Sequence, residues 1–231
     1  MSSSLQPLVL YYYGPSPNPM KVLMIIEELG LPYKLEEVDD KQLKVEPFIS
    51  LNPNGRAPAM IDPNRDITLF ESNAIIDYLI EEYDTENKLH YTTFKEKHLS
   101  RCWGYFQVSG QGPYFGQSAW FHHYHPEKVQ SAIDRYVKEA RRVTEVLEAH
   151  LAKQGTDYLV GDRITYADLA WLPYYNSWQR IVPNGNIDDL KLVQAWLDRM
   201  RSRPAIAKVL EFMRVESVKR FGAPKEAEKK E

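Results

Sequence analysis

The chain has 231 residues, of which 43% are hydrophobic and 12% aromatic, with 29 basic against 32 acidic residues and a net charge of -3. This length suits one large domain or two modest ones, and the near-balanced charge offers no electrostatic footprint for nucleic acid or for an anionic membrane. Met1–Gln6 lacks a signal-peptide pattern, no apolar run reaches about 18 residues, and Cys102 is the single cysteine. The sequence therefore predicts a cytoplasmic protein without a membrane span, an internal disulfide or a CxxC pair.

Short strand-like and helix-like runs alternate over residues 1–84. They read as strand, helix, strand, short helix or turn, two strands and helix, at residues 7–14, 18–30, 33–40, 46–55, 57–62, 67–70 and 72–83. The apolar face of the first helix ends at Gly30, which suits the C′ position, and Pro32 blocks continuation. The order βαβαββα predicts an α/β domain that contains parallel strands.

The composition changes after Tyr83, where the polar segment "DTENKLHYTTF" predicts a linker. No convincing strand follows it. The later helical patterns cover residues 92–108, 127–154, 166–180, 190–203 and 205–219. We therefore expect an all-helical domain over residues 92–220 and a charged, frayed tail over residues 221–231.

The segment "ITYADLAW" carries a strong folding signal. Thr165 can cap a helix while Asp168, three residues later, reaches back to it, as in an acidic variant of the capping box. Ile164 and Leu169 occupy the positions where a hydrophobic staple packs. A structural role for Asp168 is therefore expected.

Three short motifs each have a structural interpretation and a second, ligand-binding interpretation. Asn18 followed by Pro19 fits the N-cap and N1 positions of the first helix, and Ser16 suits a turn. A cis bond at Ala57-Pro58 would free the Ala57 backbone to pair with an extended ligand, whereas a trans bond would give an ordinary proline-initiated strand.

The third motif is the pair Glu71-Ser72, which precedes the helix at residues 72–83. Ser72 is a good N-cap, and free N–H groups at a helix N-terminus attract anions. A ligand carboxylate could bind at Ser72 while Glu71 pairs with a ligand ammonium group.

No metal site is expected. His122, His123 and His125 are close in the sequence, but no cysteine accompanies them and they precede a proline in an expected loop. Cys102 lies in an apolar helical pattern beside Trp103, where a free cysteine usually packs as a small hydrophobe.

Taken together these pieces resemble the cytosolic glutathione transferase superfamily, over roughly residues 8–214. Within it the chain is most similar to the bacterial nu class and to the fungal branch that includes the transferase-like domain of the yeast nitrogen-regulation prion protein. The stretches that carry the resemblance are "PSPNPMKV", "LNPNGRAPAMID", "LFESNAI", "GQGPYFGQ", "AIDRYVKEARRV" and "SRPAI". The resemblance implies a thioredoxin-like N-terminal domain, an all-helical C-terminal domain and a cytoplasmic fungal homodimer that acts in detoxification or stress response.

The resemblance also implies a role for individual residues in binding glutathione, the co-substrate. The Ala57 backbone corresponds to the one that pairs with the cysteinyl unit, and Glu71 and Ser72 correspond to residues that hold the γ-glutamyl end. Asn18 corresponds to an asparagine near the glutathione sulfur, and Ser16 lies where related classes have a threonine or a catalytic serine.

At the glycyl end Arg56 corresponds to an arginine of the yeast regulator, and the sequence leaves open whether Gln42 or Lys44 contacts the carboxylate. Arg135 corresponds to an arginine that reaches glutathione from the neighbouring subunit.

The chemistry that the resemblance implies requires a thiolate. A free thiol titrates near about 8.5, and donors aimed at sulfur favour the anion. Without a CxxC pair in the chain, glutathione must supply the reacting sulfur. We expect thiol–disulfide exchange or deglutathionylation, with conjugation to electrophiles or a non-catalytic binding role as alternatives. The aromatic residues of the second domain either line a pocket for an apolar or disulfide partner or form helical core; they are Trp103, Phe106, Tyr114, Phe115, Trp120 and Phe121.

Overall fold

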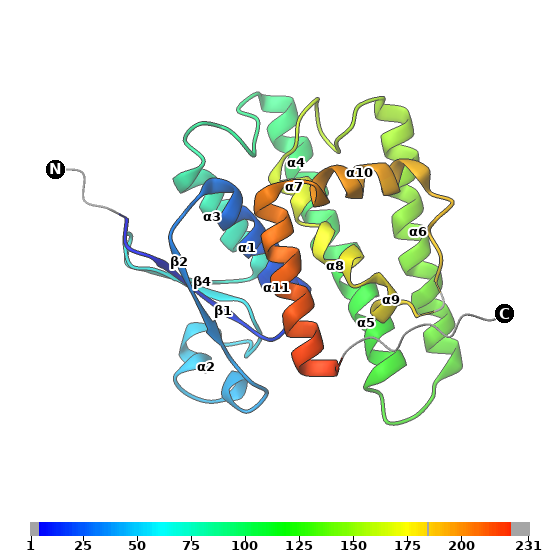
Figure 1. Cartoon of the computed structure of the whole chain (residues 1–231), viewed down its shortest axis with the longest axis horizontal. Helices are drawn as coiled ribbons and strands as arrows, with labels where there is room; N and C mark the ends of the chain where they lie inside the picture. The colour runs from blue at the N-terminus through cyan, green and yellow to red at the C-terminus, as the bar shows by residue number, and fades with distance from the viewer. Residues whose placement is uncertain (1–4, 184, 223–231) are drawn as a thin grey trace.

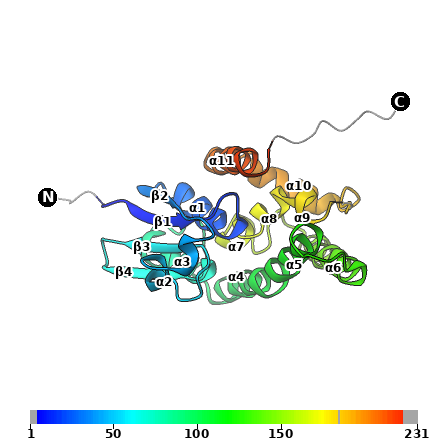
Figure 2. The same cartoon turned by 90° about the horizontal axis from the view of Figure 1, so that it is seen from below.

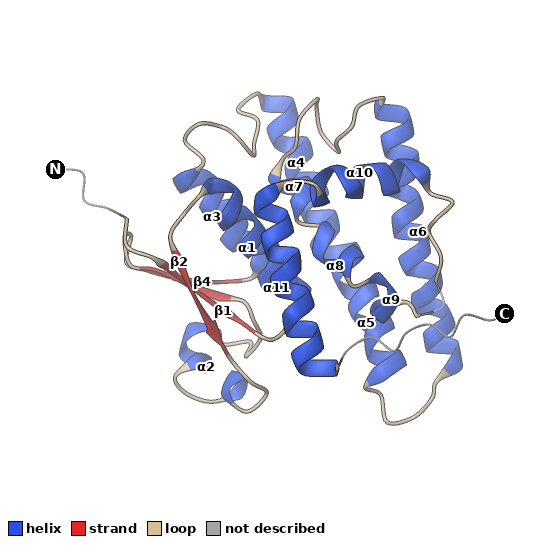
Figure 3. Cartoon of the chain, viewed as in Figure 1, coloured by secondary structure: helices blue, strands red, loops and turns tan. Residues whose placement is uncertain are grey.

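The computed structural model describes residues 5–183 and 185–222, which form a small sheet with three helices followed by a larger helical part (Figure 1). The strands occur in the N-terminal part, whereas the rest of the described chain is helix and loop (Figure 3). The fold is therefore a thioredoxin-like α/β unit followed by a helical domain, as the sequence predicts.

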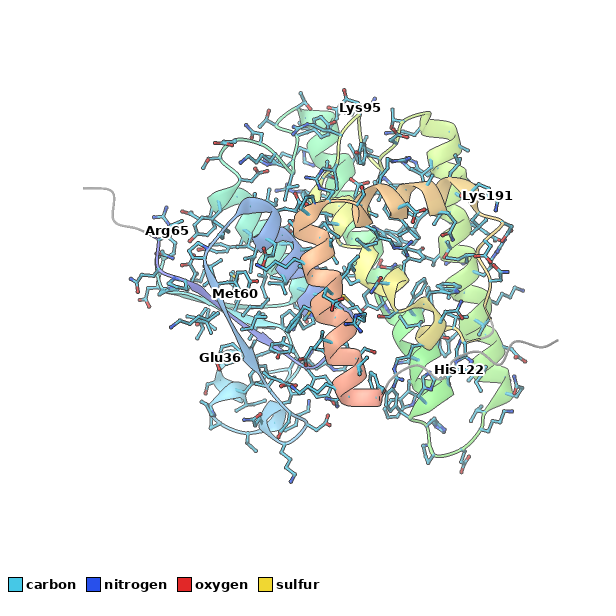
Figure 4. The ribbon with its side chains drawn as sticks, in the orientation of Figure 1. Glu36, Met60, Arg65, Lys95, His122 and Lys191 are labelled. Carbon is cyan, nitrogen blue, oxygen red and sulfur yellow. The ribbon has the colours of Figure 1, made fainter. Side chains whose placement is uncertain are left out.

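The sheet has the strand order β2-β1-β3-β4. β1 (Leu8–Tyr12) is parallel to β2 (Tyr33–Glu37) and antiparallel to β3 (Ala59–Asp62), which pairs in antiparallel fashion with β4 (Ile67–Phe70). Met60, labelled in Figure 4, is fully buried in this sheet, whereas Arg65 marks the turn between β3 and β4. The predicted order βαβαββα is confirmed, with an additional 3-10 turn η1 (Gln42–Lys44) before α2 (Phe48–Leu51).

Helix α1 (Pro17–Leu29) joins the sheet to the helical domain. It packs against α3 (Ser72–Tyr83) and α11 (Pro204–Phe221), which lie on opposite sides of it in Figure 2. The residues from Met20 to Ile26 are all buried, and the core that they enter continues from the sheet into the helical domain. Burial of each Leu or Ile side chain stabilises the fold by roughly 1.5–3 kcal/mol. These contacts therefore fix α1 to both the sheet and the helical domain. Gly30 ends the helix in the left-handed conformation, as predicted.

The helical domain differs from the sequence prediction in two places. Residues 112–123, for which no helix was predicted and whose last residues were expected to begin a loop, form a helix. Residues 166–180, expected to be one helix, are three short ones. The helices are α4 (Phe94–Phe106), α5 (Gly112–His123), α6 (Gln130–Gln154), α7 (Tyr166–Leu169), α8 (Leu172–Asn176), α9 (Trp178–Ile181) and α10 (Lys191–Arg201), with a π-helical segment η2 (Gln107–Gln111) between α4 and α5.

Proline accounts for the start of α5 and for the break between α7 and α8. Pro113 is in the first turn of α5, where the missing N–H would have no helical partner, so a residue that suggests a loop is compatible with a helix start. Pro173 likewise lies in the first turn of α8. A proline at this position interrupts a helix that would otherwise continue from α7. Of the charged tail, Phe221 belongs to α11, and residues 223–231 lie outside the described residues. No helix in the described ranges is long and apolar enough to cross a membrane.

Candidate functional site

The sheet register brings four loops to one edge. Tyr11 pairs with Ala59, and Ala59 pairs with Phe70, so the end of β1, the start of β3 and the end of β4 lie in a row. The parallel strand β2 ends at the same edge, because Tyr12 pairs with Glu37. The segments that leave this edge carry Ser16 and Asn18, Arg56 and Ala57, Glu71 and Ser72, and Gln42 and Lys44.

Helix α1 begins earlier than the sequence suggests. Ser16 is its N-cap and Asn18 is the second helical residue, so the expectation that Asn18 is the N-cap is wrong. Pro17 and Pro19 both belong to the first turn and have no N–H, which leaves few backbone donors there. The Ser16 hydroxyl makes no capping hydrogen bond. The side chains of Ser16 and Asn18 are therefore donors available at this helix end, together with the few backbone N–H groups that remain.

The turn before β3 presents an unpaired peptide. The Asn52 amide donates to the carbonyl oxygens of Arg56 and Pro58, and the Ala57–Pro58 bond is cis. Within the described ranges, neither the N–H nor the carbonyl of Ala57 makes a hydrogen bond. The Arg56 and Pro58 carbonyls thus accept hydrogen bonds from Asn52, while the N–H and carbonyl of Ala57 remain available to a ligand.

The loop after β2 holds the two residues that the sequence left open, Gln42 and Lys44. The Gln42 side chain accepts a hydrogen bond from the Asp39 N–H at 2.8 Å, which turns it back onto its own loop. The Lys44 ammonium group donates to the Gly55 carbonyl at 2.7 Å and so lies on the turn that carries Arg56. Lys44 is therefore the cation beside this turn.

The start of α3 places a carboxylate beside a helix N-terminus. Glu71, not Ser72, is the N-cap; it is exposed and has a positive φ of 67°, which is uncommon for a residue other than glycine. Ser72 is the first helical residue and is buried. Its side chain makes no hydrogen bond within the described part of the chain, so its hydroxyl and the first N–H groups of α3 can serve an anion.

Arg135 is separate from these residues. It is exposed on α6, which lies on the side of the helical domain away from the sheet in Figures 1 and 2. It forms no ion pair with any residue that the structure describes. Its own chain therefore does not bring it to the edge where the other candidate residues gather.

Two residues that the sequence interpretation missed lie beside Asn18. The Tyr174 hydroxyl donates to Asn18 Oδ1 at 3.1 Å, and Lys21 Nζ donates to Gln107 Oε1 at 2.5 Å. Lys21 is fully buried; burial lowers its pKa to about 7, and the Glu71 carboxylate opposes that shift. A lysine inside an apolar run could have drawn attention to Lys21. No local pattern points to Tyr174, because 156 residues separate it from Asn18.

The six aromatic residues considered for a second pocket do not form one group. Phe115 is fully buried against Tyr174, Tyr175 and Trp178, and so belongs to the core. Trp103 and Phe106 pack on the buried Trp171. Tyr114 is partly buried against the same core, Phe121 stacks on Tyr136, and Trp120 is exposed. Core packing therefore accounts for most of them.

The histidines and the cysteine have separate surroundings. His122 and His123 end α5 rather than lying in a loop, and His122 is labelled in Figure 4 far from the sheet. The rings of His122, His123 and His125 each contact a different backbone carbonyl, those of Ser118, Arg180 and Glu127. No cluster of metal-binding side chains occurs within residues 5–183 and 185–222. Cys102 is exposed on α4, so the expectation that it packs as a hydrophobe is wrong.

The gathered groups suit an extended, peptide-like ligand. An unpaired peptide at Ala57 can pair with its backbone, the Glu71 carboxylate can bind an ammonium group, and Arg56 and Lys44 are cations for a carboxylate. The helix end with Ser16 and Asn18 lies at the same edge and can supply donors to an atom that carries negative charge.

Comparisons with known proteins identify the family to which this site belongs. The glutathione S-transferase N-terminal domain model matches residues 10–87, and the C-terminal domain model matches residues 107–204. The glutathione S-transferase-like protein tpcF of Aspergillus fumigatus is 44% identical over 218 residues, which cover 88% of this chain and 95% of that protein. The transcriptional regulator URE2 of Saccharomyces cerevisiae is 34% identical over 242 residues, covering 89% of this chain and 68% of that protein.

One solved structure is similar to this chain in both fold and sequence. The glutathione transferase URE2P6 from Phanerochaete chrysosporium, crystallised with oxidized glutathione, superposes with a TM-score of 0.86 at 41% identity and covers 94% of this chain and 100% of its own. With two matching domain models, a thioredoxin-like sheet and a helical domain, the chain belongs to the glutathione S-transferase family.

Proposed function

We propose that this protein is a glutathione transferase-like enzyme that uses glutathione or glutathione disulfide for thiol–disulfide exchange and deglutathionylation of small substrates. The observation that carries the proposal is the N-terminal end of α1, where the Asn18 amide and the Ser16 hydroxyl are available as donors and two prolines remove backbone N–H groups. The relative URE2P6 was crystallised with oxidized glutathione, which is a disulfide and a product of such a reaction.

The remaining groups at the sheet edge support a binding mode for glutathione. In this mode the Ala57 backbone pairs with the cysteinyl unit, and Glu71 and Ser72 hold the γ-glutamyl end. Arg56 and Lys44 receive the glycyl carboxylate; Lys44 is favoured over Gln42 because its ammonium group already lies on the Gly55 turn. Asn18 then faces the sulfur.

The proposed reaction needs no redox group from the protein. The glutathione thiolate attacks one sulfur of a substrate disulfide, forms a mixed disulfide and releases the other sulfur as a thiolate, which takes up a proton. A second glutathione thiolate attacks the mixed disulfide to give glutathione disulfide and the second substrate thiol. Because only the thiolate is nucleophilic, donors from Asn18 and Ser16 raise the fraction of reactive glutathione at neutral pH.

We predict that Asn18→Ala lowers glutathione-dependent reduction of a small disulfide, such as hydroxyethyl disulfide, by about tenfold or more, and that Ser16→Ala lowers it less. The larger effect is expected for Asn18 because an amide N–H next to sulfur stabilises the anion. Ser16→Ala should keep its thermal stability, since the Ser16 hydroxyl supplies no capping hydrogen bond to α1, whereas Asn18→Ala also removes the acceptor of the Tyr174 hydroxyl and should lose some. Wild-type protein that binds glutathione but shows no turnover would disprove the enzyme proposal.

Conjugation of glutathione to electrophilic compounds is a second candidate, because it uses the same thiolate and because tpcF is described as glutathione S-transferase-like. A conjugation assay with a chloronitrobenzene substrate beside the disulfide assay separates the two activities. A non-catalytic binding role is a third candidate, since URE2 is described as a transcriptional regulator. It predicts glutathione binding without turnover in either assay.

The protein is further proposed to act as a homodimer in the cytoplasm. Exposed residues on one face of α4 support an interface, because Phe94, His98, Cys102 and Tyr105 follow helical spacing along it. Phe94 has 81% of its surface exposed and Tyr105 57%, which is unusual for large apolar side chains. In such a dimer Arg135 would approach glutathione bound to the other subunit.

A further inference from the structure

The Asn18 amide has two ends with opposite character. Its nitrogen donates hydrogen bonds and its oxygen accepts them, so only one orientation can stabilise a thiolate. Within the described residues, Asn18 Oδ1 accepts a hydrogen bond from Tyr174, and Nδ2 makes none. The orientation in which oxygen faces the helical domain therefore leaves the nitrogen available to a ligand.

The surroundings of Tyr174 keep its hydroxyl protonated, so that it can donate a hydrogen bond. Tyr174 is on α8, has 6% of its surface exposed, and its ring packs edge-to-face on Phe115 at 6.1 Å between centroids. Burial raises its pKa to about 12, while the charge of Arg56 acts in the opposite direction. The hydroxyl therefore keeps its proton at neutral pH and can donate it to Asn18 Oδ1.

The Tyr174 hydroxyl also lies beside the start of α5. A Cβ added at Gly112, the first residue of α5, would lie 3.4 Å from the Tyr174 hydroxyl and 3.4 Å from the Gln107 carbonyl oxygen, which is ordinary van der Waals contact. The hydroxyl therefore lies where α1 meets the segment from η2 to α5.

A second polar contact holds the same face of α1. Lys21 lies three residues after Asn18, so both side chains leave one face of the helix. Lys21 donates to Gln107, whose amide donates to Gln111 Oε1 at 3.0 Å, and Gln111 donates to the Trp171 carbonyl at 3.1 Å. The helical domain therefore binds the N-terminal half of α1 through directional hydrogen bonds at two adjacent points.

We propose that Tyr174 is a positioning residue for thiolate formation: by donating to Asn18 Oδ1 it directs Asn18 Nδ2 toward the glutathione sulfur. This inference rests on the proposed function, in which Asn18 donates to that sulfur. It assigns the helical domain a part in activating glutathione, in addition to any part in binding a second substrate. Tyr174 itself touches neither reactant and acts through Asn18.

The test is Tyr174→Phe, which keeps the ring and removes only the hydroxyl. The pKa of the bound glutathione thiol is measured from the ultraviolet absorbance of the thiolate as a function of pH. We expect this pKa to rise by about half a unit to one unit and the turnover number for disulfide reduction to fall about threefold to tenfold, as loss of one hydrogen bond implies. The dissociation constant for glutathione should stay unchanged at a pH well below the thiol pKa, where glutathione binds as the thiol, because the hydroxyl acts on the thiolate.

The matched control is Tyr175→Phe. The Tyr175 hydroxyl is also buried, but it donates to Thr144 at 3.0 Å and does not contact Asn18. This variant should leave the thiol pKa unchanged even if it lowers thermal stability. In an Asn18→Ala background, Tyr174→Phe should have no further effect on the thiol pKa, because Tyr174 acts only through Asn18.

The outcomes separate this inference from the proposed function. If Asn18→Ala raises the thiol pKa and Tyr174→Phe does not, the positioning role is wrong and the proposed function stands. Equal shifts for Tyr174→Phe and Tyr175→Phe, or additive effects with Asn18→Ala, also overturn the positioning role. If Asn18→Ala titrates like the wild type, Asn18 does not activate the thiol and the positioning role of Tyr174 is wrong, whereas a wild type without turnover would overturn the proposed function itself.

Discussion

Lys21 is a buried cation in a helix whose other buried residues are mainly apolar. Within the described residues its side chain makes one hydrogen bond, to the neutral amide of Gln107, and the Glu71 carboxylate is the charge that favours its protonated form. Burial favours the neutral amine, which lowers the pKa of Lys21 to about 7 from the value of 10.5 that an exposed lysine has. The residue therefore reduces the stability of the fold at neutral and acidic pH.

We predict that Lys21→Met stabilises the protein at pH 7 and that this gain shrinks as the pH rises toward 10. Between the folded pKa of about 7 and the unfolded value of 10.5, the unfolded chain holds a proton that the folded chain lacks, so wild-type stability rises with pH by up to about 1.4 kcal/mol per unit. Methionine removes this dependence. Urea unfolding of both proteins at pH 6, 8 and 9.5 measures it.

The exposed Lys34→Met is the matched control, since it removes a lysine that is not buried. If Lys21→Met and the wild type lose or gain stability in parallel over this pH range, the buried-cation explanation is wrong.

At the scale of elements, Asp168 holds the start of α7 in place. Its Oδ2 accepts hydrogen bonds from the Thr165 N–H and hydroxyl, which confirms the reciprocal cap predicted from "ITYADLAW". Its Oδ1 accepts two more, from the Leu159 N–H and the Trp196 indole at 2.9 Å each. Burial raises the pKa of this carboxyl group, and the four hydrogen bonds oppose that shift.

We predict that Asp168→Ala lowers the free energy of unfolding by about 3–5 kcal/mol, because it leaves several buried donors without an acceptor. Urea unfolding measures the loss. The exposed Asp198→Ala on α10 should cost less than about 1 kcal/mol, since it removes only a surface ion pair with Arg201. A protein that keeps its stability but loses glutathione binding would contradict the structural role of Asp168.

Local sequence signals located elements well where one face of an element is buried. The strands and α1 were predicted because apolar periodicity and Pro or Gly boundaries agree, and α6 begins within three residues of its expected start. The prediction failed at α5 and at residues 166–180. Gly112 and Pro113 at the start of α5 disfavour a helix assignment from sequence. From Ala167 to Tyr175 every residue is buried, Asp168 included, so the sequence shows no helical period from which the breaks could be located.

At the scale of the whole molecule, the proposed dimer interface is the exposed face of α4, where large apolar side chains contact solvent. It carries Phe94 and Tyr105 beside His98 and Cys102, and Leu99, and Phe70 of β4, are exposed as well. We predict that the wild type is a dimer by light scattering and that Tyr105→Glu is a monomer, because a buried unpaired charge opposes association. Leu192→Glu, on the exposed side of α10, should leave the mass unchanged.

Cys102 provides an independent readout of the same prediction. It lies on the proposed face, so its thiol should react more slowly with a maleimide in the wild type than in Tyr105→Glu. Equal reactivity, or a monomeric wild type, would show that this face is not the interface. A dimeric Arg135→Ala variant with weakened glutathione binding would support the expected contact across the subunits.

The sequence by itself determined the kinds of element, their order and the residue types of the candidate site, because periodicity, proline and glycine act over a few neighbours. The tertiary structure alone decided how those residues meet. The sheet register gathers loops from β1, β2, β3 and β4 at one edge, and Tyr174 reaches Asn18 across 156 residues. Such contacts depend on the packing of α1 between two domains, which no local pattern specifies.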